Sequence, residues 1–129
     1  MFGEKPLFGQ VEISVDKKGR ICIPATTKRE PGEELVILYN KQFDVHEIYS
    51  VKSLEDRFNK LNNLIENAQN KNDQNFYKKS LYELSKSILR SEIVDLQGRI
   101  LTGKIFEGEE KVLSTGAYNH LIIKPIKKK

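Results

Sequence analysis

Two arginines each follow directly after a glycine in two copies of one short motif. The segment Val15–Ile21 (VDKKGRI) returns as Val94–Ile100 (VDLQGRI), with Val, Asp, Gly, Arg and Ile at corresponding positions. Asp and Gly are typical of tight turns, because Asp accepts local backbone hydrogen bonds and Gly adopts the left-handed conformation. A turn does not need Arg after Gly. The planar guanidinium offers a fork of donors that suits phosphate or O6 and N7 of guanine, so the repeat predicts a binding device used in duplicate.

The first copy carries more positive charge than the second. Lys17 and Lys18 share its turn with Arg20, and Lys28 and Arg29 follow a few residues beyond. Lysines would attract phosphates whatever the sequence, whereas Arg20 could read base edges. These five cations are therefore candidate nucleic-acid-binding residues.

The second copy keeps the turn but loses the lysines. Leu96 and Gln97 stand in their places, so Arg99 is the only cation in this turn. Arg99 either contacts nucleic acid or supports the turn or an interface, and the sequence leaves both roles open. The residues expected to form the two turns are Asp16, Gly19, Asp95 and Gly98.

The elements that position the first turn are predicted to be strands. Apolar residues alternate with polar ones over 11–15 and resume after the turn, until Pro24 ends the strand because it cannot donate to a ladder. A second hairpin is expected from 35–39 and 43–49, joined around 40–42.

Two amphipathic helices are predicted in the middle of the chain. Ser53 is the expected N-cap of the first and Asp73 of the second, with the polar stretch 66–74 as their connection. The apolar positions recur at intervals of four, three and four residues, as on one helix face, at Leu54, Phe58, Leu61 and Ile65 and again at Tyr77, Leu81, Leu84 and Ile88. The two segments together predict a helical hairpin.

The last third repeats the β pattern in shorter form. A hairpin is expected around 116–119, and the basic end 124–129 is expected to be frayed. The predicted organisation is a first β unit at 1–52, a helical hairpin at 53–90 and a second β unit with a basic tail at 91–129. The expected fold class is α+β, with two β-hairpin units related by an internal repeat in one compact domain.

Composition argues against several other classes of protein. The 129 residues carry a net charge of +4, and no segment approaches the roughly 20 apolar residues that cross a bilayer. The single cysteine, Cys22, excludes an intramolecular disulfide and a cysteine-rich zinc site, and neither His46 nor His120 has a catalytic context. We therefore expect a cytoplasmic protein that is not an enzyme and that uses no cofactor, metal or membrane.

The segment VDKKGRICIP, which begins at Val15, resembles the DNA-binding hairpin of AbrB/SpoVT-type bacterial regulators. Two copies separated by a helical pair resemble the MraZ family of transcriptional regulators, over roughly Phe8 to Lys124. The resemblance implies a double AbrB/SpoVT-like fold, a homo-oligomer (a ring or a smaller assembly), association with the nucleoid, and repression through direct repeats near the protein's own promoter. It further implies that Arg20 and Arg99 face double-stranded DNA and that the two turn lysines assist.

A second class of function stays open at this point. The chain could be an AbrB-like antitoxin or a protein-interaction module with reduced or no DNA binding. The altered second motif favours this alternative, as does Thr102-Gly103, where the family resemblance leads one to expect Pro. A stable co-purifying protein without salt-sensitive DNA binding would select it.

Overall fold

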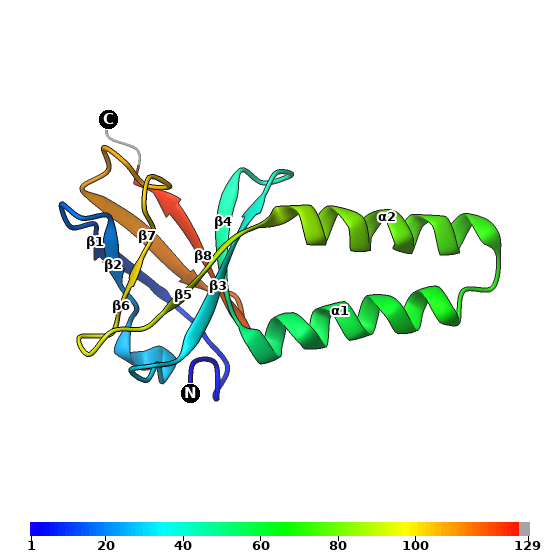
Figure 1. The fold of residues 1–129 in the computed structure, drawn as a ribbon, viewed down its shortest axis with the longest axis horizontal. Coiled ribbons are helices and arrows are strands. Elements are labelled where there is room, and N and C mark those ends of the chain that lie inside the picture. The colour runs from blue at the N-terminus through cyan, green and yellow to red at the C-terminus, as the bar shows by residue number, and fades with distance from the viewer. Residues whose placement is uncertain (127–129) are drawn as a thin grey trace.

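The computed structural model of the chain describes residues 1–126, which form an α+β fold with antiparallel sheets, as expected. In Figure 1 the two helices lie side by side and extend to the right from the β part of the molecule. The elements in chain order are β1 (Gln10–Ser14), β2 (Arg20–Cys22), a short 3₁₀ helix η1 (Ala25–Thr27), β3 (Glu34–Asn40), β4 (Val45–Ser50), α1 (Val51–Glu66), α2 (Lys71–Ser87), β5 (Ile88–Ile93), β6 (Arg99–Leu101), β7 (Lys111–Gly116) and β8 (His120–Pro125).

Corresponding strands from the two halves of the chain lie at symmetric positions in the larger sheet. The order is β1-β7-β8-β4-β3-β5, and β2 pairs with β6 in a separate two-stranded ribbon. If β1, β3 and β4 correspond to β5, β7 and β8, the order is a palindrome centred between β8 and β4. The strands of 1–52 and of the second unit therefore interleave, because β1 pairs with β7 and β5 pairs with β3.

The main hydrophobic core lies between the ribbon and one face of the larger sheet. Ile21 and Ile23 are fully buried, and Ile100 is 1% exposed. They pack in one cluster with sheet residues such as Ile37 and Ile123. Burying such side chains stabilises the fold by about 1.5–3 kcal/mol each, so the ribbon is held firmly against the sheet.

The structure corrects both predicted helix caps. Ser50 is the N-cap of α1, and its hydroxyl accepts a hydrogen bond from the amide of Ser53 at 3.1 Å. The prediction of Ser53 was wrong because β4 runs directly into α1. Asn70 rather than Asp73 caps α2: its side chain accepts from the Asp73 amide at 2.8 Å and donates to the Asp73 carboxylate at 3.1 Å.

The ends of several other predicted elements also differ from those observed. The helices span 51–66 and 71–87 rather than 53–90, and Ile88, expected on a helix face, lies in β5. The strand expected from 43 begins at Val45, because Asp44 adopts a left-handed conformation with φ of 51°. Lys124 and Pro125, expected in a frayed tail, end β8, and 127–129 lie outside the described residues.

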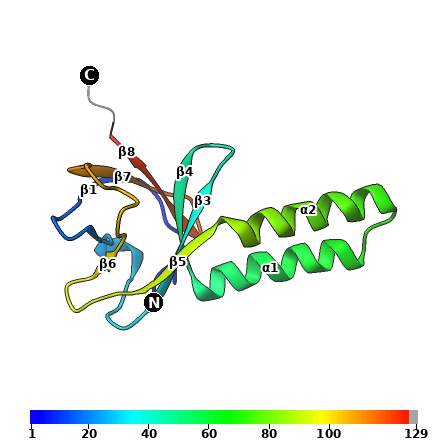
Figure 2. The same ribbon diagram turned by 45° about the horizontal axis from the view of Figure 1, so that its top comes forward.

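The helical hairpin packs on the other face of the sheet only near its base. A second hydrophobic cluster joins Leu54 of α1 and Leu84 of α2 to Leu38 and Tyr49 of the sheet. Figure 2 shows the rest of the hairpin extending away from the β part. Among residues 1–126, no helix has the length and apolar character that a membrane crossing requires.

Candidate nucleic-acid interface

The first turn is closed by one aspartate. Asp16 Oδ1 accepts hydrogen bonds from the backbone amides of Lys18 and Arg20, each at 2.9 Å. Gly19 has a φ of 76°, in the left-handed region where an L side chain is strained. The remaining carboxylate oxygen, Oδ2, lies 2.7 Å from Nε of Arg20. The motif therefore fixes both the backbone turn and the direction of its arginine.

The second turn repeats this geometry. Asp95 Oδ1 accepts from the amides of Gln97 and Arg99 at 2.9 Å, and Gly98 has a φ of 78°. Asp95 Oδ2 lies 2.9 Å from Nε of Arg99. Of the five residues identical in the two copies, Asp and Gly thus make the turn, and the Asp also binds the Arg that follows.

Both aspartates are held in their ionised form. Backbone hydrogen bonds from Arg20 and Arg99 are the largest cause that lowers the pKa of Asp16 and of Asp95, respectively, below the ordinary range. The bonds from the guanidinium groups act in the same direction. A carboxylate therefore binds each arginine at Nε, and the two terminal nitrogens, Nη1 and Nη2, are not needed for this contact.

The pairing of β2 with β6 places both arginines on one face of the ribbon. Arg20 lies opposite Leu101, and Arg99 lies opposite Cys22. Residues opposite one another, or two apart on one strand, share a face of an antiparallel pair, so these four side chains lie together. The Ile21–Ile100 pair between them points to the other face, into the core.

The ribbon continues by one backbone bond at each end, where it meets the two turns. The amide of Thr102 donates to the carbonyl of Gly19 at 2.7 Å, and the amide of Ile23 donates to Gly98 at 2.9 Å. The turns therefore lie at opposite ends of the ribbon, about 14 Å apart at ~3.4 Å per residue. In Figure 1 β2 and β6 lie on the side away from the helices.

The two arginines differ in how many of their donors are occupied. Among residues 1–126, neither terminal nitrogen of Arg20 has a hydrogen-bond partner. In contrast, Arg99 donates from Nη2 to Oε1 of Gln97 at 3.1 Å, and its Nη1 lies 3.9 Å from Asp16. The terminal nitrogens of Arg20 are therefore less occupied than those of Arg99.

The other predicted cations separate in space. Lys17 and Lys18 are exposed at the tip of the first turn, and Lys28 is exposed after η1. Arg29, expected near the first turn, reaches the second instead, because η1 turns the chain across the end of the ribbon. Its guanidinium lies on Gly98.

Contacts of Arg29 with the ribbon fix its position. Nη2 of Arg29 is 3.9 Å from the sulfur of Cys22, and its Nε is buried with no hydrogen-bond partner among the described residues. Arg29 therefore shields the second turn rather than adding charge to the first. Sequence reasoning also missed Cys22 and Leu101 as members of the outward face, although their alternation with Ile21 and Ile100 is the signal that reveals them.

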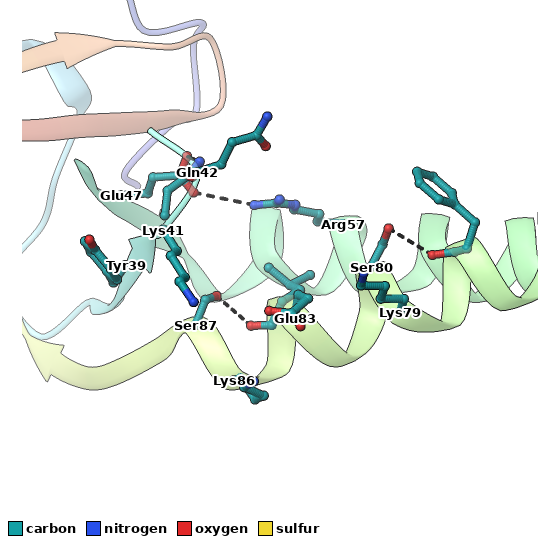
Figure 3. Close-up of a pocket in the computed structure, with 13 residues that line it drawn as sticks. Tyr39, Lys41, Gln42, Glu47, Arg57, Lys79, Ser80, Glu83, Lys86 and Ser87 are labelled. Atoms are coloured by element: carbon teal, nitrogen blue, oxygen red, sulfur yellow. Dashed lines mark hydrogen bonds and ion pairs between the residues drawn. The ribbon is translucent and has the colours of Figure 1, made fainter. Parts of the chain in front are cut away.

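An open groove of about 860 Å³ lies between the β3–β4 hairpin and the two helices. Figure 3 shows its lining residues, including Glu47 at the sheet, Arg57 on α1 and Lys79 on α2. Glu47 is only 7% exposed, and its carboxylate meets Asn40 at 3.3 Å and both Arg57 and His120 at 3.6 Å.

The charges in this groove serve to join elements of the fold. Burial opposes ionisation of Glu47, but hydrogen bonds from His120 and Asn40 and the charge of Arg57 outweigh it and lower its pKa. Arg57 also donates to the hydroxyl of Tyr49 at 2.8 Å. These contacts tie α1 and β8 to β4.

No protein-family model matches the chain, and no curated protein matches it. Within the described part of the chain, no group of three or more His, Cys, Asp or Glu side chains is placed to hold a metal ion.

Proposed function

We propose that the protein is a sequence-specific DNA-binding transcriptional regulator of the MraZ type, with a double AbrB/SpoVT-like fold. The observation that carries the proposal is the shared outward face of β2 and β6. One ribbon carries a Gly-Arg turn at each end, and each arginine is held by the aspartate of its own turn. A two-stranded ribbon fits the major groove of B-DNA and can read base edges from within it.

Each part of the ribbon has a distinct task in this proposal. The terminal nitrogens of Arg20 donate to O6 and N7 of a guanine, while Lys17 and Lys18 bind phosphates beside it. The carboxylate of Asp16 keeps the guanidinium from turning away. Because Ile21 and Ile100 anchor the opposite face of the ribbon in the core, the arginine is presented on a rigid support.

Oligomerisation supplies the affinity that one ribbon lacks. Linked ribbons on one homo-oligomer, a ring or a smaller assembly, bind direct repeats at a high effective concentration. Exposed apolar side chains on the helical hairpin support contact between subunits: Phe76 is 66% exposed and Tyr82 is 62% exposed. Repeats near the protein's own promoter place the bound assembly in the path of RNA polymerase, and the protein then acts as a nucleoid-associated repressor in the cytoplasm.

A fluorescence anisotropy titration with DNA from upstream of the gene tests the proposal. Losing one bidentate contact costs about 1–3 kcal/mol, so Arg20→Ala should weaken specific binding by roughly 5- to 150-fold. Lys60→Ala, which removes an exposed charge from α1, is the matched control and should bind like wild type. Unchanged specific binding by Arg20→Ala would remove the basis of the proposal.

Repeating the titration at several salt concentrations tests the proposed phosphate contacts. Phosphate neutralisation releases counterions, so the logarithm of affinity should fall linearly with the logarithm of salt concentration. Lys17→Ala should make this slope shallower by about one unit without changing base preference. Binding that does not respond to salt would contradict the proposed phosphate contacts.

The second candidate function is a protein-interaction module, such as an AbrB-like antitoxin. Two observations favour it: Arg99 uses Nε and Nη2 for bonds within the chain, and the helical hairpin exposes large apolar side chains. A co-purifying protein that protects Phe76 and Tyr82, with no salt-sensitive DNA binding by the wild type, would select this function.

A further inference from the structure

The tips of the two turns are geometrically equivalent but chemically different. Lys18 and Gln97 each donate a backbone hydrogen bond at 2.9 Å to the aspartate of their own turn, so they occupy the same position in it. Lysine at this position is a point charge without base preference, whereas an amide carries one acceptor and two donors. Opposite ends of one ribbon therefore present different chemistry to any duplex that lies along it.

The amide of Gln97 has a defined orientation. Its Oε1 accepts a hydrogen bond from Nη2 of Arg99 at 3.1 Å, and this donor distinguishes the amide oxygen from the nitrogen. Oε1 keeps a second lone pair, and Nε2 has no hydrogen-bond partner among residues 1–126. An amide with one acceptor site and one donor free is what bidentate binding to N6 and N7 of adenine requires.

Leu96 stands beside this amide at the tip of the second turn. Its side chain is 88% exposed, more than Phe8 or Phe43, which are 77% and 69% exposed. Here the chain places a large apolar group in water instead of the lysine of the first turn. In a major groove such a group contacts the C5-methyl of thymine, the partner of adenine.

Arg99 contacts the side chain of Gln97 and both turn aspartates. Its Nε is bound to Asp95 at 2.9 Å, Nη2 is bound to Gln97, and Nη1 faces Asp16 at 3.9 Å. A guanidinium has five N–H donors, so Nη1 and Nη2 keep further donors, but the bonds to Asp95 and Gln97 fix the plane of the Arg99 group. Arg99 is accordingly a positioning residue, whereas Arg20 at the other end of the ribbon has both terminal nitrogens free.

We propose that the second turn recognises an A·T base pair in the major groove, with Gln97 reading adenine, Leu96 contacting thymine and Arg99 orienting Gln97. This inference rests on the proposed DNA-binding function and names the bases that its second turn reads. Gln97 lies about four residues along the ribbon from Arg20, or roughly 14 Å at ~3.4 Å per residue. With ~3.4 Å between base pairs, the A·T pair lies about four base pairs from the guanine bound by Arg20, and the site is not a palindrome.

Selection from a pool of randomised duplexes, followed by titration of single-base variants, tests the inference. Wild type should prefer A·T by roughly 5- to 150-fold at one position about four base pairs from the guanine whose preference Arg20→Ala removes. Gln97→Glu keeps the shape and the contact with Arg99 but can only accept, so its preferred base should change from adenine to cytosine, whose N4 donates. Arg99→Ala should weaken the A·T preference and leave the guanine preference in place.

Lys18→Glu is the matched control, because it puts the same charge at the equivalent position of the first turn. It should lower affinity for all sequences by a similar factor and leave the base at the second turn unchanged. If Gln97→Glu binds too weakly to rank bases, Gln97→Ala should still bind and should show a weaker A·T preference than wild type at that position, because the bidentate contact is lost.

The outcomes separate this inference from the function on which it rests. An unchanged A·T preference in Gln97→Glu or Gln97→Ala, or a wild type with no A·T preference near the guanine, overturns the inference. In each case, Arg20-dependent and salt-sensitive binding leaves the proposed function in place. A wild type that binds no duplex in a salt-sensitive way overturns the proposed function itself.

Discussion

Alanine at the two motif glycines should have unequal effects on stability, although the glycines occupy equivalent turns. Both have a positive φ, 76° at Gly19 and 78° at Gly98, and an L residue there costs about 1–2 kcal/mol. A Cβ on Gly19 would lie 2.5 Å from the carbonyl oxygen of Gly103, a backbone atom of the neighbouring segment. A Cβ on Gly98 would instead meet the guanidinium of Arg29, the flexible end of a side chain.

The cost of Gly19→Ala therefore has two parts. Overpacking against atoms that move only with their backbone adds about 1–3 kcal/mol, and the shift strains the 2.7 Å bond from Thr102 to Gly19. We expect Gly19→Ala to lose about 2–5 kcal/mol, a large part of the ~5–15 kcal/mol that stabilises a typical domain. Gly98→Ala should lose only about 1–2 kcal/mol, because Arg29 can swing outward.

Urea denaturation of both variants, followed by circular dichroism, measures the difference. The slopes should match that of wild type, with a lower midpoint for both variants and the larger shift for Gly19→Ala. Equal midpoints for the two variants, or a larger loss for Gly98→Ala, would refute the packing of Gly19 against Gly103.

Three further predictions concern elements that support the ribbon. Ile100→Ala removes a side chain that is 1% exposed and should cost about 2–5 kcal/mol in urea denaturation, whereas alanine at its neighbour Leu101, 38% exposed, should cost under about 1 kcal/mol. Ser50→Ala should lower the free energy of unfolding by about 1 kcal/mol, because it removes the cap of α1, and Ser53→Ala should lower it less. A larger loss for Ser53→Ala would contradict Ser50 as the cap. The folded state lowers the pKa of Glu47, so its contribution to stability is present above the unfolded-state pKa and is lost as pH falls through the folded-state pKa. Stability of wild type should thus fall below about pH 4.5, and Glu47→Gln should show a shallower fall over that range; parallel curves would contradict this role.

The sequence predicted the turns well because their determinants are local. Asp and Gly specify the turn through bonds within a few residues, so Asp16 and Asp95 could be assigned their turn-forming role from the motif alone. Strand and helix segments followed from apolar periodicity. The differences lie at element ends: the sequence predicts Ser53 and Asp73 as caps, whereas Ser50 and Asn70 accept hydrogen bonds from the amides of those two residues.

Features that depend on long-range pairing could not be predicted from the repeat. Similarity between two segments does not reveal that they pair with one another, as β2 and β6 do. The position of Arg29 against Gly98 and the contact of Arg99 with Asp16 both follow from that pairing. The unequal availability of the two arginines is therefore a property of the fold.

Hydrogen exchange followed by mass spectrometry, with and without duplex DNA from upstream of the gene, tests whether the two turns of the ribbon bind DNA. DNA binding should slow amide exchange in the peptides covering 15–22 and 94–101, and Arg20→Ala should lose that protection. Duplex-dependent protection confined to the helical hairpin or the β3–β4 hairpin, with unchanged exchange at both turns, would contradict DNA binding by the ribbon.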